Sequence, residues 1–121
     1  MPKVLIVDDS PTETHVMRAT LEKNGFEVLA AEDGESGLKM AREALPDVII
    51  MDVVMPGMNG FQATRAISKD PETQHIPIII VSTKDQETDR VWGMRQGAKD
   101  YISKPVIEED FMSKIASALG K

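Results

Sequence analysis

Val48-Ile49-Ile50-Met51-Asp52 carries the strongest indication of the fold of this chain. Its four apolar residues are followed at once by an acidic one. A continuously apolar run of this length indicates a strand that is buried on both faces. The run Ile76–Val81 has the same character. Strands of this kind occur in parallel sheets that carry helices on both faces, so the two runs predict such a sheet.

Apolar runs alternate with segments of helical spacing on either side of this stretch. The runs expected to form strands are Val4–Val7, Val28–Ala31, Val48–Met51, Ile76–Val81 and Tyr101–Ile102. A helical segment follows each of them, which implies right-handed crossovers and parallel strands. Because 121 residues are too few for an eight-fold barrel, the predicted fold class is α/β with an open sheet.

The helices carry start and stop signals. Ser10 is placed to cap the first helix, Pro11 suits its first position, Glu13 completes a capping box, and Gly25 ends it. The next helix starts near Asp33. The others are expected at about 60–68, at about 84–96 with Gly97 as the stop, and around Phe111, Ile115 and Leu119.

The helical spacing also predicts which residues face the core. These are Val16, Met17, Thr20 and Leu21 in the first helix, Leu38, Ala41 and Leu45 in the second, and Phe61, Thr64 and Ile67 in the third. Trp92, in the fourth helix, is expected in the core or partly buried, with an exposed partner contact as the alternative.

Size and charge limit the function classes. A chain of 121 residues fits one domain, residues 1–121. The net charge of −6 disfavours nucleic-acid binding and contact with an acidic membrane surface. No cysteine is present, which excludes disulfides and thiolate metal sites. Since no signal peptide or membrane span is found, we expect a soluble, cytoplasmic protein without membrane insertion.

Polar side chains follow the predicted strands at the point where each strand ends. Asp8 and Asp9 follow the first strand and Asp52 follows the third; Ser82-Thr83 and Lys104 follow the fourth and fifth. Ligands bind to parallel sheets at these carboxyl ends, so the side chains are expected to meet. Neighbouring carboxylates repel unless a cation neutralises them, and Mg²⁺ prefers oxygen ligands. The pattern therefore predicts a magnesium site.

A carboxylate beside a metal can attack phosphorus and form an acyl phosphate. Lys104 then supplies a second positive charge for the phosphoryl oxygens. Taken alone, Asp8-Asp9 and Ser82-Thr83 are more typical of helix caps, and Asp52 could begin a turn. The combination of all of these residues at successive strand ends favours phosphoryl transfer to Asp52.

The chain resembles the receiver domain of two-component response regulators over its whole length. The matching motifs are Val7-Asp8-Asp9-Ser10, Met51-Asp52-Val53-Val54-Met55-Pro56-Gly57-Met58-Asn59-Gly60, Val81-Ser82-Thr83, Gly97-Ala98-Lys99-Asp100-Tyr101 and Lys104-Pro105. The resemblance implies a flavodoxin-like (βα)5 sheet of strand order 2-1-3-4-5, and a stand-alone receiver without an effector domain.

The resemblance also implies a role for each site residue. Asp52 is the expected phospho-acceptor. The expected metal ligands are Asp8, Asp9, Asp52 and the backbone carbonyl of Val54. The phosphoryl group is expected to contact Ser82, Thr83 and Lys104. Tyr101 is the expected switch partner, which turns inward when Ser82 moves toward the phosphate, and the Lys104–Pro105 bond is expected to be cis.

Partners follow from the same resemblance. A histidine kinase of chemotaxis type would donate the phosphoryl group, and a protein partner would receive the output of a monomeric regulator. Residues Asn59–Arg65 and Val81–Asp89 resemble regulators of type IV pilus, or twitching, chemosensory pathways. Whether the protein transmits a signal or acts as a phosphate sink is left open. No enzymatic activity is expected beyond its own phosphorylation and dephosphorylation.

Two other functions fit an α/β fold of this size less well. A phosphohydrolase resembling the haloacid-dehalogenase family needs an acid–base Asp where this chain has Val54. A flavin module needs a phosphate-binding loop after the first strand, where Asp8 and Asp9 stand. The charged run Lys84–Arg90 is expected to be a solvated face, and it is also a candidate output surface.

Overall fold

The computed structural model describes residues 1–121 as five strands and five helices in strict alternation. The strands are β1 (Lys3–Val7), β2 (Glu27–Ala31), β3 (Val48–Met51), β4 (Ile78–Ser82) and β5 (Asp100–Ser103). The helices are α1 (Pro11–Lys23), α2 (Gly34–Ala44), α3 (Gly60–Lys69), α4 (Glu87–Arg95) and α5 (Glu108–Ala118).

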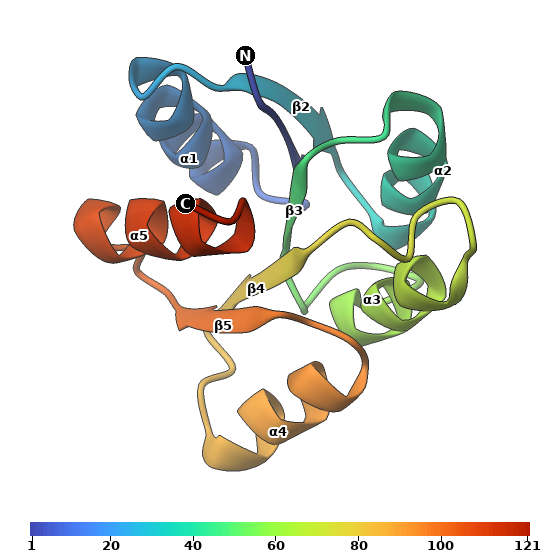
Figure 1. Ribbon diagram of the computed structural model, residues 1–121. Coiled ribbons are helices and arrows are strands. Elements are labelled where there is room, and N and C mark those ends of the chain that lie inside the picture. Colours follow the sequence, from blue (N-terminus) through green and yellow to red (C-terminus); the bar gives the residue numbers. More distant parts are fainter.

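All strand pairs are parallel, and the order across the sheet is β2-β1-β3-β4-β5. The predicted fold class and strand order are therefore confirmed. Figure 1 shows α1 and α5 on one face of the sheet and α2 and α3 on the other, with α4 beside β5. The central strand β3 is fully buried, as its apolar run predicted.

Each face of the sheet has its own apolar core. On the α1/α5 face, Met17, Leu21, Phe111 and Ile115 pack onto the strands. On the opposite face the side chains of α2 and α3 do so, among them Ala41 and Ile67. The two cores clamp the strands from both sides, so the carboxyl edge of the sheet is a rigid platform for functional side chains.

Three predicted core residues lie at the surface instead. Val16 is exposed beside the buried Met17, and Leu45 is exposed because it ends α2 in the left-handed conformation, with φ 46°. Trp92 has 51% of its surface exposed, which makes the core prediction wrong. Helix α4 faces β4 and β5 through Gly93, its one buried residue, and the neighbouring Trp92 lies on the solvent side of the helix.

Two boundaries also differ from the prediction. Helix α4 begins at Glu87 and not near Lys84. The Lys84 backbone is tied to the sheet, because its N–H donates to the Ser82 side chain and its carbonyl accepts from the Tyr101 hydroxyl. Strand β4 begins at Ile78, after Pro77, which has no N–H for a strand ladder.

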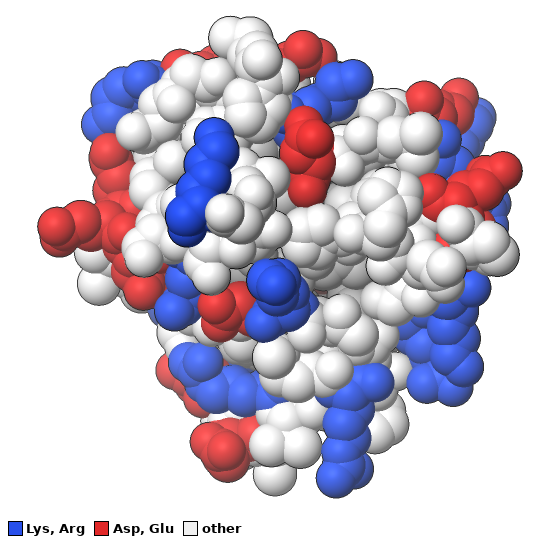
Figure 2. All heavy atoms as spheres, viewed as in Figure 1, with Lys and Arg blue, Asp and Glu red and all other residues white.

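None of the helices is long and apolar enough to cross a membrane. On the face drawn in Figure 2, acidic and basic side chains are interspersed. The net charge of −6 disfavours binding to the phosphate backbone of nucleic acids.

Candidate functional site

The ends of β1 and β3 hold two acidic side chains in register. Val7 pairs with Met51 in the last pair of the ladder, and Asp8 and Asp52 follow these two residues directly. The Asp52 N–H donates to the Val7 carbonyl at 2.9 Å, and the Asp8 N–H donates to the Ala31 carbonyl at 3.0 Å. The sheet thus fixes the backbone from which both carboxylates project.

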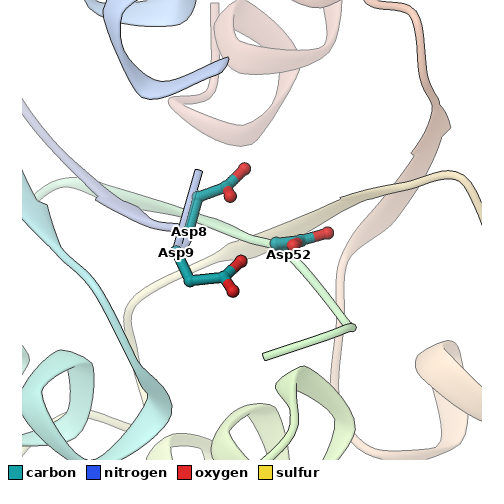
Figure 3. A group of neighbouring side chains, drawn as sticks. All are labelled: Asp8, Asp9 and Asp52. Carbon is teal, nitrogen blue, oxygen red and sulfur yellow. The ribbon is translucent and has the colours of Figure 1, made fainter. Parts of the chain in front are cut away.

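Asp8, Asp9 and Asp52 form a cluster in which carboxylate oxygens lie within 4.8 Å of one another. Figure 3 shows Asp8 and Asp9 side by side at the end of β1, with Asp52 opposite them at the end of β3. Asp8 and Asp52 are buried, whereas Asp9 is open to solvent. The sequence expectation that these three side chains meet is confirmed.

The surroundings of Asp52 disfavour its charge. Burial raises the pKa of the Asp52 carboxyl to about 6; the Lys104 ammonium opposes this shift and the Asp8 carboxylate adds to it. A buried carboxylate beside a second one needs more positive charge than one lysine supplies.

The donor set fits a magnesium ion. It consists of oxygen atoms alone, and the open side at Asp9 leaves room for the water ligands that Mg²⁺ retains. Val54 is exposed in the loop that follows β3. Its backbone carbonyl as a fourth ligand stays a prediction, as does the division of direct and water-mediated contacts among the three aspartates.

Lys104 reaches into the cluster from the end of β5. Its ammonium donates to Glu13 Oε2 at 2.6 Å, to Asp8 Oδ2 at 3.1 Å and to Asp52 Oδ1 at 3.4 Å. Burial alone would lower the pKa of Lys104, but the bond to Glu13 and the charge of Asp52 outweigh it and raise the pKa. The Lys104–Pro105 peptide bond is cis, as expected.

Ser82 and Thr83 end β4 on the same edge. Ser82 is fully buried, its carbonyl accepts from the Lys104 N–H at 2.9 Å, and its hydroxyl accepts from the Lys84 N–H at 3.1 Å. Thr83 is exposed. The β4–β5 pairing therefore brings Ser82 next to the end of β5, where Lys104 follows. The contacts of Ser82 and Thr83 with a phosphoryl group stay predictions.

Tyr101 is turned inward between β5 and α4. It is buried, and its hydroxyl donates to the Lys84 carbonyl. Burial raises the pKa of the Tyr101 phenol. The tyrosine expected as a switch partner is thus connected to Ser82 through Lys84, whose N–H donates to the Ser82 hydroxyl.

Arg90 is a site residue that the sequence interpretation missed, since it was assigned to a solvated face. Its guanidinium lies 5.3 Å from the centroid of the Tyr101 ring, and it donates to the Tyr101 carbonyl at 3.3 Å and to Ser103 Oγ at 2.6 Å. Arg90 therefore clamps α4 onto β5. The only local sequence signal for this role is that Arg90 lies three residues before Gly93, the residue of α4 that lies against Tyr101.

Glu13 is the second missed residue, and the predicted capping box is wrong. The Ser10 hydroxyl does accept from the Glu13 N–H, at 3.3 Å. However, the Ser10 N–H donates to Asp8 Oδ1 at 2.9 Å, and the Glu13 carboxylate turns to Lys104 instead. Its position one turn after the Asp pair was a signal for the site that the capping pattern concealed.

Gly60 lets the N-terminus of α3 approach the acidic cluster. A Cβ atom at this residue would lie 1.9 Å from the Asp52 carbonyl oxygen and 2.7 Å from the Val53 Cα. The Gly60 N–H also donates to the Val53 carbonyl at 2.9 Å. Only glycine fits here, and α3 is thereby held against the backbone that carries Asp52.

Comparison with known proteins agrees with this site. Residues 4–116 match the response regulator receiver domain family. The chain is 60% identical to Protein PilH of Pseudomonas aeruginosa over 119 residues, which cover 98% of both chains. The structure is similar to that of the chemotaxis protein CheY4 of Vibrio cholerae, with a TM-score of 0.92, 34% identity and coverage of 98% of this chain and 99% of that one.

A third relative bears on the metal. The receiver domain of the sensor histidine kinase PA1611 from Pseudomonas aeruginosa superposes with a TM-score of 0.92 at 28% identity, over 99% of this chain and 98% of that one. Its structure has a magnesium ion coordinated in the active site cleft. The family match, the strand order and the acidic cluster beside a buried lysine lead to one conclusion: the chain belongs to the response regulator receiver domain family.

Proposed function

We propose that Asp52 is the residue that accepts the phosphoryl group, and that the chain uses it to signal in a type IV pilus or chemotaxis-like pathway. The observation that carries this proposal is the position of Asp52. It is buried in the acidic cluster at the end of the central strand β3, between the Asp8 carboxylate and the Lys104 ammonium, which lies 3.4 Å from its Oδ1.

As a member of its family, the chain is a signalling protein and not a conventional enzyme, and a histidine kinase is its phosphoryl donor. In the transfer, an Asp52 carboxylate oxygen attacks the phosphorus of a phosphohistidine. The new O–P bond forms as the P–N bond breaks, and the electron pair of that bond returns to the imidazole of the kinase. The product is an aspartyl phosphate at Asp52.

The surrounding residues orient and neutralise the transferred group. Asp8, Asp9, Asp52 and the Val54 carbonyl would hold Mg²⁺, which when bound supplies positive charge for the phosphoryl oxygens. Lys104 stands 3.4 Å from Asp52 Oδ1 and would pair with the phosphoryl group from the side of β5.

Ser82, Thr83 and Tyr101 would carry the change to α4. The Ser82 hydroxyl, now bonded to the Lys84 N–H, would turn toward a phosphoryl oxygen, and the Thr83 N–H would donate to another. Tyr101 is bonded to the carbonyl of Lys84, so a shift of Lys84 would be felt at β5 and at α4.

The pathway and partners rest on similarity. The chain is 60% identical to Protein PilH over 98% of both chains, which supports a role in the same kind of pathway. The resemblance of Asn59–Arg65 and Val81–Asp89 to pilus regulators points the same way. We propose a cytoplasmic monomer that takes its phosphoryl group from a chemotaxis-type histidine kinase and acts on a protein partner.

Incubation with acetyl phosphate and Mg²⁺ tests the acceptor. The intact mass of the wild-type protein should rise by one phosphoryl group, and Asp52→Asn should abolish the gain. Asp47→Asn, at an exposed carboxylate before β3, is the matched control and should label normally. Labelling of the Asp52→Asn protein, or turnover of external phosphoesters, would reject the proposal.

A further inference from the structure

The shortest polar contact of Lys104 is with Glu13 and not with an aspartate of the acidic cluster. The distances from Lys104 Nζ are 2.6 Å to Glu13, 3.1 Å to Asp8 and 3.4 Å to Asp52. Glu13 lies in the first turn of α1, 91 residues away in the sequence. The lysine side chain is 7% exposed and the Glu13 side chain 44%.

The Glu13 carboxylate makes no other polar contact in the structure. Its carboxylate accepts no hydrogen bond from the helix N-terminus, since the Ser10 N–H is taken by Asp8. Its sole hydrogen bond and sole ion pair are with Lys104. A helix-capping role therefore does not account for this carboxylate.

The contacts use the full donor capacity of the lysine. An ammonium group has three N–H donors, and three carboxylates lie within reach of them. With Asp9, the site holds four carboxylates and one ammonium. A phosphoryl group that pairs with Lys104 must share it with Glu13, and it must enter beside a negative charge that is not a member of the acidic cluster.

The same charge acts oppositely on the two ligands of the site. A carboxylate near Lys104 offsets the lysine charge, which favours a divalent cation on the aspartates. It also repels an incoming anion and weakens the hold of the lysine on it. Since Glu13 is partly exposed, solvent screens both effects, and each should be moderate.

We propose that Glu13 is a positioning residue that holds Lys104 and balances the charge of the site, favouring Mg²⁺ and restraining the phosphoryl group. This inference rests on the proposed roles of Asp52 and Lys104. Glu13 thereby sets how readily the domain accepts a phosphoryl group, although it touches neither the metal cluster nor the acceptor.

The test compares Mg²⁺ binding with anion binding in a Glu13→Gln variant. Calorimetric titration with Mg²⁺ should give a dissociation constant about threefold to tenfold higher than that of the wild type. Titration with beryllofluoride at saturating Mg²⁺ should give a constant lower by a similar factor. The initial rate of acetyl phosphate labelling, also at saturating Mg²⁺, should rise.

Two further variants isolate the contact. Glu22→Gln removes one negative charge from the same helix, at an exposed residue that pairs with Arg18 at 3.8 Å, and should leave both constants within a factor of two of the wild type. Glu13→Asp keeps the charge near the lysine on a shorter side chain. Its two constants should lie between those of the wild type and of Glu13→Gln.

The direction of the two changes decides the matter. If Glu13 merely supports α1, both ligands will bind more weakly to Glu13→Gln, and the inference is overturned. Unchanged constants overturn it as well. Beryllofluoride binding to Asp52→Asn as tight as to the wild type would instead overturn the proposed acceptor, so the two failures are distinguishable.

Discussion

Lys104 and Arg90 are both cations that bridge β5 to a helix, but the groups that hold them differ in kind. Lys104 is surrounded by three carboxylates, from α1 and from the ends of β1 and β3. Arg90 is held by a backbone carbonyl, a serine hydroxyl and the face of a tyrosine ring. No carboxylate lies within ion-pair distance of Arg90.

This difference makes the surroundings of Lys104 responsive to ligands, whereas Arg90 acts as a clamp between α4 and β5. Carboxylates can exchange one cation for another, so the partners of Lys104 change whenever a metal ion or a phosphoryl group arrives. The neutral partners of Arg90 carry no net charge that such a change could alter. Tyr101 and Ser103 belong to β5 and Lys104 follows its last residue, so β5 connects the two regions directly.

Removal of the lysine should have the largest effect on the charged region. Lys104→Gln leaves the carboxylates without their one ammonium, and the rate of acetyl phosphate labelling at Asp52 should fall by about 10²- to 10³-fold. Mg²⁺ should bind more tightly, because the remaining charge is negative. The measurement is intact mass against time at saturating Mg²⁺.

Lys99→Gln, at an exposed lysine just before β5, is the control. It should label at the wild-type rate. A Lys104→Gln protein that labels within threefold of the wild type would show that Lys104 does not serve the phosphoryl group.

A pair of glycines compares how the two regions are packed. A Cβ at Gly60 meets backbone, 1.9 Å from the Asp52 carbonyl oxygen, whereas a Cβ at Gly93 meets side-chain ends, 2.9 Å from Ile80 Cδ1 and 3.0 Å from Tyr101 Cε2. Gly60→Ala should therefore lower the free energy of unfolding by about 3 kcal/mol or more, and Gly93→Ala by about 1 kcal/mol. Urea unfolding measures both, and equal losses would contradict this account.

Charge on Asp52 should make the metal-free protein less stable as the pH rises. Because the pKa of Asp52 is raised to about 6, the folded state binds its proton more tightly than the unfolded state does, and stability falls between about pH 4 and pH 7. In EDTA, Asp52→Asn should exceed the wild type at pH 8 by about 2 kcal/mol, with a smaller gain below pH 4.

Added Mg²⁺ should reverse this order at pH 8, since the wild type binds the ion more tightly than Asp52→Asn. Chemical unfolding at several pH values with and without Mg²⁺ provides the measurement. A wild-type advantage at pH 8 in EDTA would mean that Lys104 more than offsets the burial of Asp52.

The clamp should show the smallest effect and should leave the chemistry intact. Arg90→Ala removes two hydrogen bonds and the contact with the Tyr101 ring, and should cost about 1–2 kcal/mol of unfolding free energy. Labelling of Asp52 by acetyl phosphate should stay within twofold of the wild type. The single tyrosine of the chain makes its ring signals in NMR spectra unambiguous, and they should shift toward solvent-exposed values.

Arg95→Ala, at an exposed arginine in the last turn of α4, is the matched variant and should leave the Tyr101 signals in place. A tenfold loss of labelling in Arg90→Ala would show that the contacts of Arg90 do affect phosphorylation of Asp52, and it would contradict this account.

The five-stranded fold and the acidic site could be predicted from the amino-acid sequence. The apolar runs at β3 and β4 indicated a buried parallel sheet, because residues covered on both faces leave a continuous pattern. The position of a residue at a strand end then placed Asp8, Asp52 and Lys104 at one edge. Both the sheet and the position of these residues at its edge could be inferred from residues that are adjacent in the sequence.

The partners of individual side chains could not be predicted, because they come from elements that are distant in the sequence. Glu13 fits a capping box locally, yet Lys104, 91 residues away, takes its carboxylate. Arg90 stands in a charged run, yet it closes on Tyr101 and Ser103. Trp92 lies exposed because Gly93, its neighbour, is what lets α4 approach β4 and β5. Such contacts depend on how each helix packs against the sheet. The pattern of neighbouring residues in the sequence carries no information about this packing.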